Sequence, residues 1–274
     1  MFKTLLVPVD PRPRSLRSLE IAGKIADRWD SHVIGLYVKP SMYLPAGVEA
    51  GAETLAELQR RTLAELVAEA RARFDAGVKA AGITRSEFRA DEGDIAEVVA
   101  LHARYADLVI VNQTDPEADT RTNFADAVLM WVGRPVLVVP YTGQFKTLGE
   151  RVLVAWNASR EAARAVTDAL PFLQRAQQVV VLSIAGKRTT SEFGGTPGAD
   201  VAVYLARHGV KTEVAPTVAA DVDAGEEILS RAFDYGADLI VMGAYGHSRA
   251  REIVLGGATR TVLKSMTVPV LMSH

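Results

Sequence analysis

The stretch ADLIVM, at Ala237–Met242, decides the fold, because nearly the same letters, ADLVIV, stand at Ala106–Val111. Both stretches are apolar runs of the length of a strand. A second apolar run follows each of them, as GRPVLVV at Gly133–Val139 and as TVPVLM at Thr267–Met272. Two copies with the same order of elements predict a tandem repeat more strongly than either copy could alone.

The two copies also begin alike. The apolar runs TLLVPVD at Thr4–Asp10 and RVLVAWN at Arg151–Asn157 each lead into apolar positions at helical spacing. Almost continuously apolar strands are typical of sheets that are covered by helices on both faces, and alternation with helices predicts parallel βαβ units. The sequence therefore predicts an α/β fold. We expect two tandem doubly wound domains, 1–142 and 149–274, each a mainly parallel five-stranded sheet flanked by about four helices.

Capping signals and a polar joint support this division. A helix that resembles a capping box at its start precedes each inner strand, with Asp94 followed by Glu97 and Asp223 followed by Glu226. The joint between the domains is expected near Tyr141–Gly149, which is short and polar and contains two glycines.

The middle parts of the two repeats differ. Residues 50–82 form one long helical pattern, in which Glu57–Arg61 and Glu69–Arg73 are favourable i,i+4 pairs. The matching region of the second repeat, Ser191–His208, is shorter and predicts a loop followed by a short helix. The expected apolar stripe of the long helix consists of Leu55, Leu58, Leu63, Leu66, Val67, Ala70, Phe74 and Val78.

Composition excludes several classes of protein. The 274 residues are 49% hydrophobic and 23% charged, with a net charge of −2 and no cysteine. This rules out disulfides and thiolate chemistry, and makes nucleic acid and anionic membranes poor candidate partners. No apolar run approaches the length of a membrane span, and the first residues do not resemble a signal peptide, so we expect a cytoplasmic protein.

The segment that carries chemistry directly follows the second inner strand. It reads GAYGHSRAREIVLGGAT, from Gly243 to Thr259, and enters a helix that is expected to run to about Ser265. Ligands of open α/β sheets bind at the carboxyl ends of the strands. Glycines there bare the main-chain N–H groups for an anion, and a helix N-terminus adds its dipole. His247, Arg249 and Arg251 lie between the glycines and could offset phosphate charge.

The spacing Gly-x2-Gly-x9-Gly between these two strands resembles the ATP-binding signature of universal stress proteins, and the resemblance covers nearly the whole chain as two copies. It implies an adenine nucleotide in the second domain, either ATP or AMP, with Mg²⁺ as an optional companion. The residues placed at this nucleotide site are Ala155, Asn157, Ile184, Met242, Gly243, Gly246, His247, Arg249, Gly256, Gly257 and Ala258.

Two positions depart from the family pattern. Asn157 stands where the family has Asp, and Gly257 stands where it usually has Ser or Thr. The first repeat keeps Pro8, Asp10 and Val38 at its strand ends, but the loop after its inner strand has no glycine. That loop instead carries the acidic residues Asp115, Glu117 and Asp119. Because these charges would repel phosphate, we expect no nucleotide in the first domain.

Structural interpretations stand beside the functional ones. The glycine segment can be a tight turn, Trp156 a packing residue, and Asp10 a helix N-cap. Asn157 and Ser159 compete for the cap of the next helix, and His247 can be a solvated loop residue. The acidic stretch of the first domain is more typical of a solvated loop than of a metal site. No histidine pair has the spacing of metal ligands, and no catalytic motif is recognisable.

Three functions remain open. The first is a stress-response or regulatory protein that binds a nucleotide, with at most slow ATP hydrolysis. The second is a nucleotide-independent interaction scaffold with degenerate pockets. The third, an enzyme related to the ATP pyrophosphatases, is disfavoured because their loop is absent after either first strand. The resemblance further implies that the last strands of the two repeats pair, as in an internal pseudo-dimer, and that two chains can form a homodimer.

Overall fold

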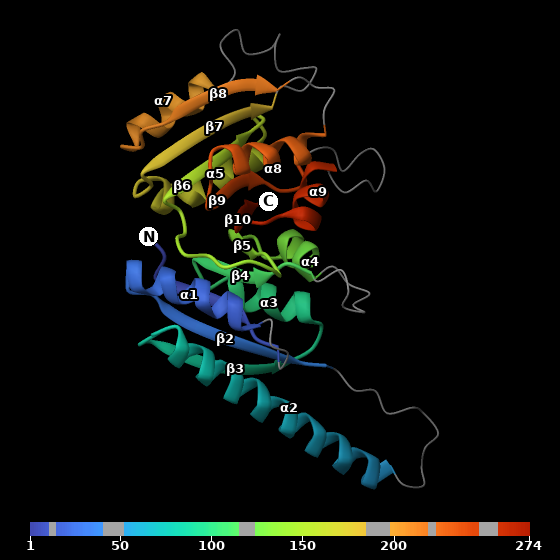
Figure 1. Ribbon diagram of the computed structural model, residues 1–274. Helices are drawn as coiled ribbons and strands as arrows, with labels where there is room; N and C mark the ends of the chain where they lie inside the picture. The colour runs from blue at the N-terminus through green and yellow to red at the C-terminus, as the bar shows by residue number, and fades with distance from the viewer. Residues whose placement is uncertain (11–14, 41–51, 115–123, 185–197, 219–222, 247–256) are drawn as a thin grey trace. The chain divides into compact units, whose positions relative to one another are not determined.

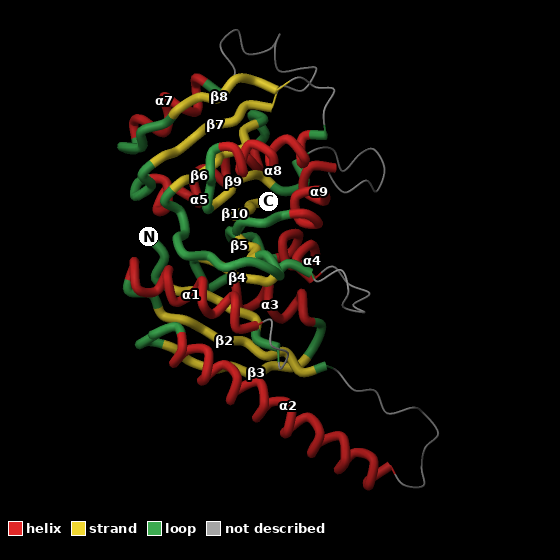
Figure 2. Tube along the Cα trace, in the orientation of Figure 1, coloured by secondary structure: helices red, strands yellow, loops and turns green. Residues whose placement is uncertain are grey.

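The computed structural model describes residues 1–10, 15–40, 52–114, 124–184, 198–218, 223–246 and 257–274. The chain divides into two compact units, from Phe2 to Ile110 and from Val111 to His274. Each unit is an α/β assembly of mainly parallel strands flanked by helices (Figures 1 and 2). The predicted α/β fold class is thus confirmed.

The first unit has the strand order β3-β2-β1-β4, with all neighbours parallel. Strand β4 (Leu108–Asn112) crosses the boundary between the units and pairs with β1 through Leu5–Leu108 and Leu6–Val109. The other elements are β1 (Thr4–Pro8), α1 (Ser15–Trp29), β2 (His32–Lys39), α2 (Ala52–Ala80), β3 (Ser86–Glu92) and α3 (Ile95–Ala103).

The second unit has the strand order β5-β10-β9-β6-β7-β8. It opens with α4 (Phe124–Trp131) and β5 (Val136–Val139), which the sequence places in the first repeat. Its remaining elements are β6 (Arg151–Trp156), α5 (Arg160–Leu173), β7 (Gln178–Ile184), α7 (Ala199–Arg207), β8 (Glu213–Val218), α8 (Ala224–Asp234), β9 (Leu239–Gly243), α9 (Gly257–Ser265) and β10 (Val270–Ser273).

Strand β10 explains why β5 lies in the second unit. It runs parallel to β9 on one side and antiparallel to β5 on the other, with Val270 opposite Val138 and Met272 opposite Val136. The predicted pairing between the last strands of the two repeats is therefore confirmed. The inner residues of these strands are fully buried, as expected for a sheet that helices cover on both faces.

Both predicted capping boxes start helices. The Asp94 carboxylate accepts hydrogen bonds from the N–H groups of Ala96 and Glu97, at 2.9 and 3.1 Å, at the start of α3. The Asp223 carboxylate accepts the equivalent bonds at the start of α8, from Gly225 at 2.7 Å and Glu226 at 3.1 Å. Each cap satisfies N–H groups that the helix itself cannot pair.

The long helix is confirmed as α2, but only part of its apolar stripe is core. The pairs Glu57–Arg61 and Glu69–Arg73 form, with N–O distances of 2.9 and 3.6 Å. Ala70 and Phe74 are buried, whereas Leu58 toward the start of the helix is 60% exposed. The apolar periodicity of α2 thus extends further toward the start of the helix than its buried face does. None of the helices in the described ranges is long and apolar enough to cross a membrane.

Helix α5 is tied to β10 through a partly buried acid. The Ser273 hydroxyl donates a 2.8 Å hydrogen bond to the Asp168 carboxylate, and Arg164 lies 3.7 Å from the same oxygen. Burial raises the pKa of Asp168, although the hydrogen bond from Ser273 and the charge of Arg164 both act to lower it. The fold therefore disfavours the charged form of this carboxyl group.

We expect Asp168→Asn to stabilise the protein near neutral pH. An acid whose pKa is raised by folding destabilises the fold above its folded pKa, and this penalty vanishes below its unfolded pKa. The amide is uncharged and still accepts the Ser273 hydrogen bond. Urea unfolding at about pH 7 should show a gain that shrinks toward about pH 4, near the pKa of an unperturbed Asp. A variant that is less stable at neutral pH would mean that the Arg164 pair outweighs burial.

Candidate functional site

The strand register places five of the predicted residues at one edge of the second unit. Ala155 near the end of β6 lies opposite Met242 of β9, and on its other side β6 pairs with β7, which ends at Ile184. Asn157 follows β6 directly, and Gly243 is the last residue of β9. Because the three strands are parallel, their carboxyl ends share this edge, where open α/β sheets bind ligands.

The segment after β9 lies against the start of α5. A Cβ atom at Gly243 would come within 2.5 Å of the main-chain nitrogen of Ala162, which is closer than real Cβ atoms approach. A Cβ at Gly246 would lie 3.2 Å from the Glu161 carboxylate and 3.3 Å from the Ser159 hydroxyl. Gly243 is therefore required by packing alone, whatever binds beside it.

The turn after β6 decides between the two predicted caps. The Ser159 hydroxyl accepts a 3.1 Å hydrogen bond from the Ala162 N–H, so Ser159 is the N-cap of α5. Asn157 instead accepts a 3.2 Å bond from the Ser159 N–H through its side-chain oxygen, which closes a local turn. Asn157 is exposed, and its side chain stands at the strand end.

Two residues without the freedom of glycine adopt left-handed backbone conformations at this edge. Ala158 has φ of 57° and Tyr245 has φ of 56°, each two residues past the end of its strand. A left-handed conformation costs a residue with a Cβ about 1–2 kcal/mol. Backbone strain of this kind is concentrated at functional sites, which makes this edge a candidate ligand site.

Helix α9 begins at the same edge. Gly257 is its first residue, and a Cβ there would have no atom of the described residues within 4 Å. The buried Thr259 hydroxyl accepts a 3.2 Å hydrogen bond from the Tyr245 N–H, which fastens the first turn of α9 to the segment after β9. The first N–H groups of α9 have no partner within the helix, and such groups favour an anion.

Sequence reasoning missed a buried acid beside the glycines. The Glu161 side chain is 5% exposed and lies 2.5 Å from the Arg160 guanidinium. Burial acts to raise the pKa of Glu161, but hydrogen bonding and the charge of Arg160 outweigh it, so that the pKa is lowered. Glu161 is charged at neutral pH. Its place in the first turn of α5, which favours an acid, was the only signal in the sequence.

Several predicted residues lie outside the described ranges. These are His247, Arg249 and Gly256 of the glycine segment, and Asp115, Glu117 and Asp119 of the first repeat. The stretch 11–14 also lies outside, so both interpretations of Asp10 stay open. In the first repeat Tyr37 has a raised pKa, because of burial and then because of the negative charge of Asp10.

The doubly repeated α/β fold and its strand-end site define the class of protein, and comparison gives the family. The model of the universal stress protein family matches residues 1–140 and 149–274. The chain therefore belongs to the universal stress protein family, with two copies of its domain.

Curated relatives and solved structures agree. Universal stress protein Slr1230 of Synechocystis is 30% identical over 150 residues, which are 53% of this chain and 49% of Slr1230. MJ0577 of Methanocaldococcus jannaschii is 45% identical over 47 residues, which are 17% of this chain and 29% of MJ0577. The chain thus spans at most about half the length of these relatives.

A universal stress protein structure from Archaeoglobus fulgidus matches the whole fold. Its TM-score is 0.70 at 19% identity, over 98% of this chain and 97% of that one. A structure from Pseudomonas aeruginosa UCBPP-PA14 has a TM-score of 0.61 at 17% identity, over 99% and 93% of the two chains. At these identities the likeness shows the fold alone.

Proposed function

We propose that this protein is a stress-response or regulatory protein that binds an adenine nucleotide, ATP or AMP, in its second repeat. The observation that carries the proposal is the N-terminus of α9, which begins with glycine at the carboxyl edge of β6, β7 and β9. The domain limits 1–142 and 149–274 are part of the proposal, as is cytoplasmic localisation.

The described residues suit the parts of a nucleotide. The first N–H groups of α9, at Gly257 and Ala258, can receive a phosphate, and the missing side chain at Gly257 leaves it room. The Asn157 amide can donate to a ribose hydroxyl or to an adenine nitrogen. Glu161 carries a negative charge near Gly246, which disfavours a phosphate directly beside that residue unless a cation such as Mg²⁺ accompanies it.

One observation favours the alternative of a nucleotide-independent scaffold. Gly243 is explained by its approach to Ala162, and Asn157 already uses its side-chain oxygen in the turn before α5. Both features would be present without a ligand. A protein of this kind would act through its surfaces, alone or as a homodimer.

Thermal unfolding with ATP or AMP, with and without Mg²⁺, tests the two functions. At about 100 times the dissociation constant, a nucleotide should stabilise the fold by roughly 2.7 kcal/mol. Gly257→Asp should abolish this gain, because its carboxylate would stand at the start of α9, clear of the other described residues, and repel a phosphate. An acid at a helix N-terminus is itself favourable, so the unliganded variant should remain folded.

Gly257→Ala is the matched control, since a methyl group there carries no charge and meets none of the residues that the structure describes. It should keep most of the nucleotide effect. A wild-type protein with no nucleotide-dependent stabilisation would support the scaffold, and an undiminished effect in Gly257→Asp would move the site elsewhere.

A further inference from the structure

The two repeats differ at a pair of positions within the second unit. Strands β4 and β9 end at Asn112 and Gly243, so that Thr114 occupies the place of Tyr245 two residues later. Counting back from Pro135 and Pro269, Asp126 of α4 occupies the place of Arg260 of α9. At the first pair of equivalent positions, Thr114 has a small hydroxyl where Tyr245 has a phenol. At the second pair, Asp126 is an acid where Arg260 is a base.

In the second repeat, the Tyr245 side chain fills the space between the end of β9 and α4. The Tyr245 hydroxyl donates a hydrogen bond to the Asp126 carboxylate, from the end of β9 to α4. Burial, and then this bond and the charge of Asp126, raise the pKa of Tyr245 well above its usual range. The ring also meets the edge of the His274 ring, with centroids 6.1 Å apart. Tyr245 is therefore a neutral donor that is held in place.

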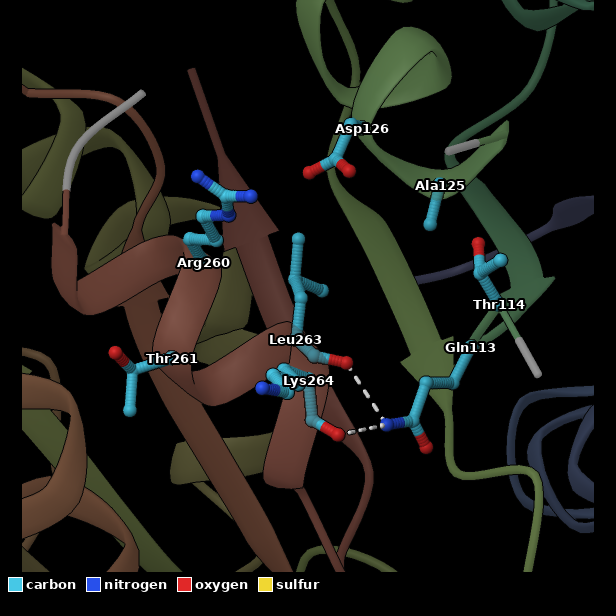
Figure 3. A pocket seen from close by; sticks show the side chains of 8 residues that line it. All are labelled: Gln113, Thr114, Ala125, Asp126, Arg260, Thr261, Leu263 and Lys264. Atoms are coloured by element: carbon cyan, nitrogen blue, oxygen red, sulfur yellow. Dashed lines mark hydrogen bonds between the residues drawn. The ribbon is translucent and has the colours of Figure 1, made fainter. Parts of the chain in front are cut away.

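At the equivalent position of the first repeat, Thr114 leaves a cavity of about 470 Å³ (Figure 3). Leu263 and Ala125 supply apolar wall, and Asp126 and Arg260 stand on opposite sides of the space. The volume lies in the range of small-molecule sites. The lining residues that the structure describes all belong to the second unit.

A buried glutamine, Gln113, holds the α9 side of the cavity wall in place. The Gln113 side-chain nitrogen donates to the carbonyls of Leu263 and Lys264, at 2.8 and 3.1 Å, and its oxygen accepts from the Tyr141 N–H at 3.1 Å. Gln113 is only 2% exposed. Because these bonds occupy both ends of its amide, Gln113 holds the end of α9 in place and is not the group that would bind a ligand.

The charges in the cavity are unequally paired. Arg260 and Lys264 lie one helical turn apart on α9, and neither forms an ion pair with another residue of the described ranges. Asp126 across the cavity already accepts the Tyr245 hydroxyl. Two cations against one hydrogen-bonded carboxylate leave the cavity with attraction for an anion.

We propose that this cavity is a second ligand site, for a small molecule that joins an aromatic ring to an anionic group. The aromatic ring of the ligand occupies the space beside Thr114. In the second repeat the phenol of Tyr245, which is equivalent to Thr114, fills the corresponding space. The anionic group, a phosphate or a carboxylate, meets Arg260 and Lys264. The site is separate from the strand edge proposed for the nucleotide and does not depend on it.

Phenyl phosphate is the probe, titrated into the full chain by isothermal calorimetry. We expect saturable binding to one site. Arg260→Gln should weaken it at least tenfold, because the guanidinium of Arg260 can donate two parallel hydrogen bonds to an anion. Arg207→Gln is the matched control, because Arg207 is also exposed near the end of a helix, α7, but lies outside the cavity. Arg260 is exposed, so its replacement should leave the fold intact.

Thr114→Tyr tests the ring directly. It should abolish phenyl phosphate binding, without lowering the melting temperature, by filling the cavity as Tyr245 fills the equivalent space. Inorganic phosphate should bind at least tenfold more weakly than phenyl phosphate. Benzoate as a parallel probe shows whether the anionic group is a carboxylate or a phosphate, and tight binding of either supports the site.

Three results would overturn the proposal: no saturable binding of either aromatic probe, equal binding of inorganic phosphate, or binding that Arg260→Gln leaves unchanged. Phenyl phosphate should still bind to Asn157→Ala, whose change lies at the nucleotide edge after β6. Failure of the nucleotide assignment would therefore leave this result untouched, and the two proposals can fail separately.

Discussion

Gly243→Ala is expected to destabilise the protein by about 1–3 kcal/mol, the usual cost of forcing an extra carbon into a packed site. The added methyl would lie 2.5 Å from the Ala162 nitrogen and 2.7 Å from the Glu161 carbonyl carbon. These are main-chain atoms at the start of α5, which cannot move aside as a flexible side chain can. Either α5 shifts away from β9, or the capping hydrogen bond from the Ala162 N–H to the Ser159 hydroxyl is lost.

Urea unfolding of Gly243→Ala and Gly257→Ala side by side measures this effect. Both replace a glycine of the same segment, but within the described part of the chain the methyl at residue 257 meets no atom within 4 Å. Gly257→Ala should be neutral or stabilising by up to about 1 kcal/mol, since alanine is the better helix former. Equal stability of the two variants would show that β9 and α5 do not approach as closely as described.

Phe74→Ala should cost about 3–5 kcal/mol, because it removes a fully enclosed aromatic ring from the first unit. Phe74 is 1% exposed and packs from α2 toward β2 and β3, with the Phe88 ring 5.8 Å away. Its ring lies 2.4 Å from where a Cβ of Gly35 would be. Urea unfolding measures the loss, and a cost below that of an ordinary surface substitution would contradict the burial of this ring.

A double-mutant cycle tests whether the ring explains the glycine. Gly35→Ala alone should destabilise by about 1–3 kcal/mol through overpacking. In the Phe74→Ala background the same change should cost much less, since the space is then vacant, which gives a coupling energy between the two sites. Additive effects would mean that Gly35 is required for another reason.

Local pattern was enough to predict much of the fold. The inner strands, the caps at Asp94 and Asp223, and the span of α2 each follow from residues close together in the sequence. The end of α9 at Ser265 agrees with the expected limit. The pairing of β5 with β10 followed from the family resemblance rather than from periodicity, because no local signal names the partner of a strand.

Contacts between distant residues could not be predicted. The approach of Ala162 to Gly243 and the bond between Tyr245 and Asp126 join elements that are about 80 and about 120 residues apart. The exposed start of the α2 stripe has the same origin, since periodicity shows which face is apolar but not how far a neighbour covers it. All the predicted nucleotide-site residues remain predictions, and three of them, His247, Arg249 and Gly256, lie outside the described ranges.

The antiparallel pairing of β5 with β10 frees the two repeats to become different. In a twofold dimer of identical chains, the same residues of both chains form the interface. A substitution in that interface therefore always appears on both sides of it. Because one chain supplies both strands here, Asp126 and Arg260 could take opposite charges at matching positions. A surface that symmetry would constrain in a dimer of identical chains can therefore differ on its two sides within this one chain.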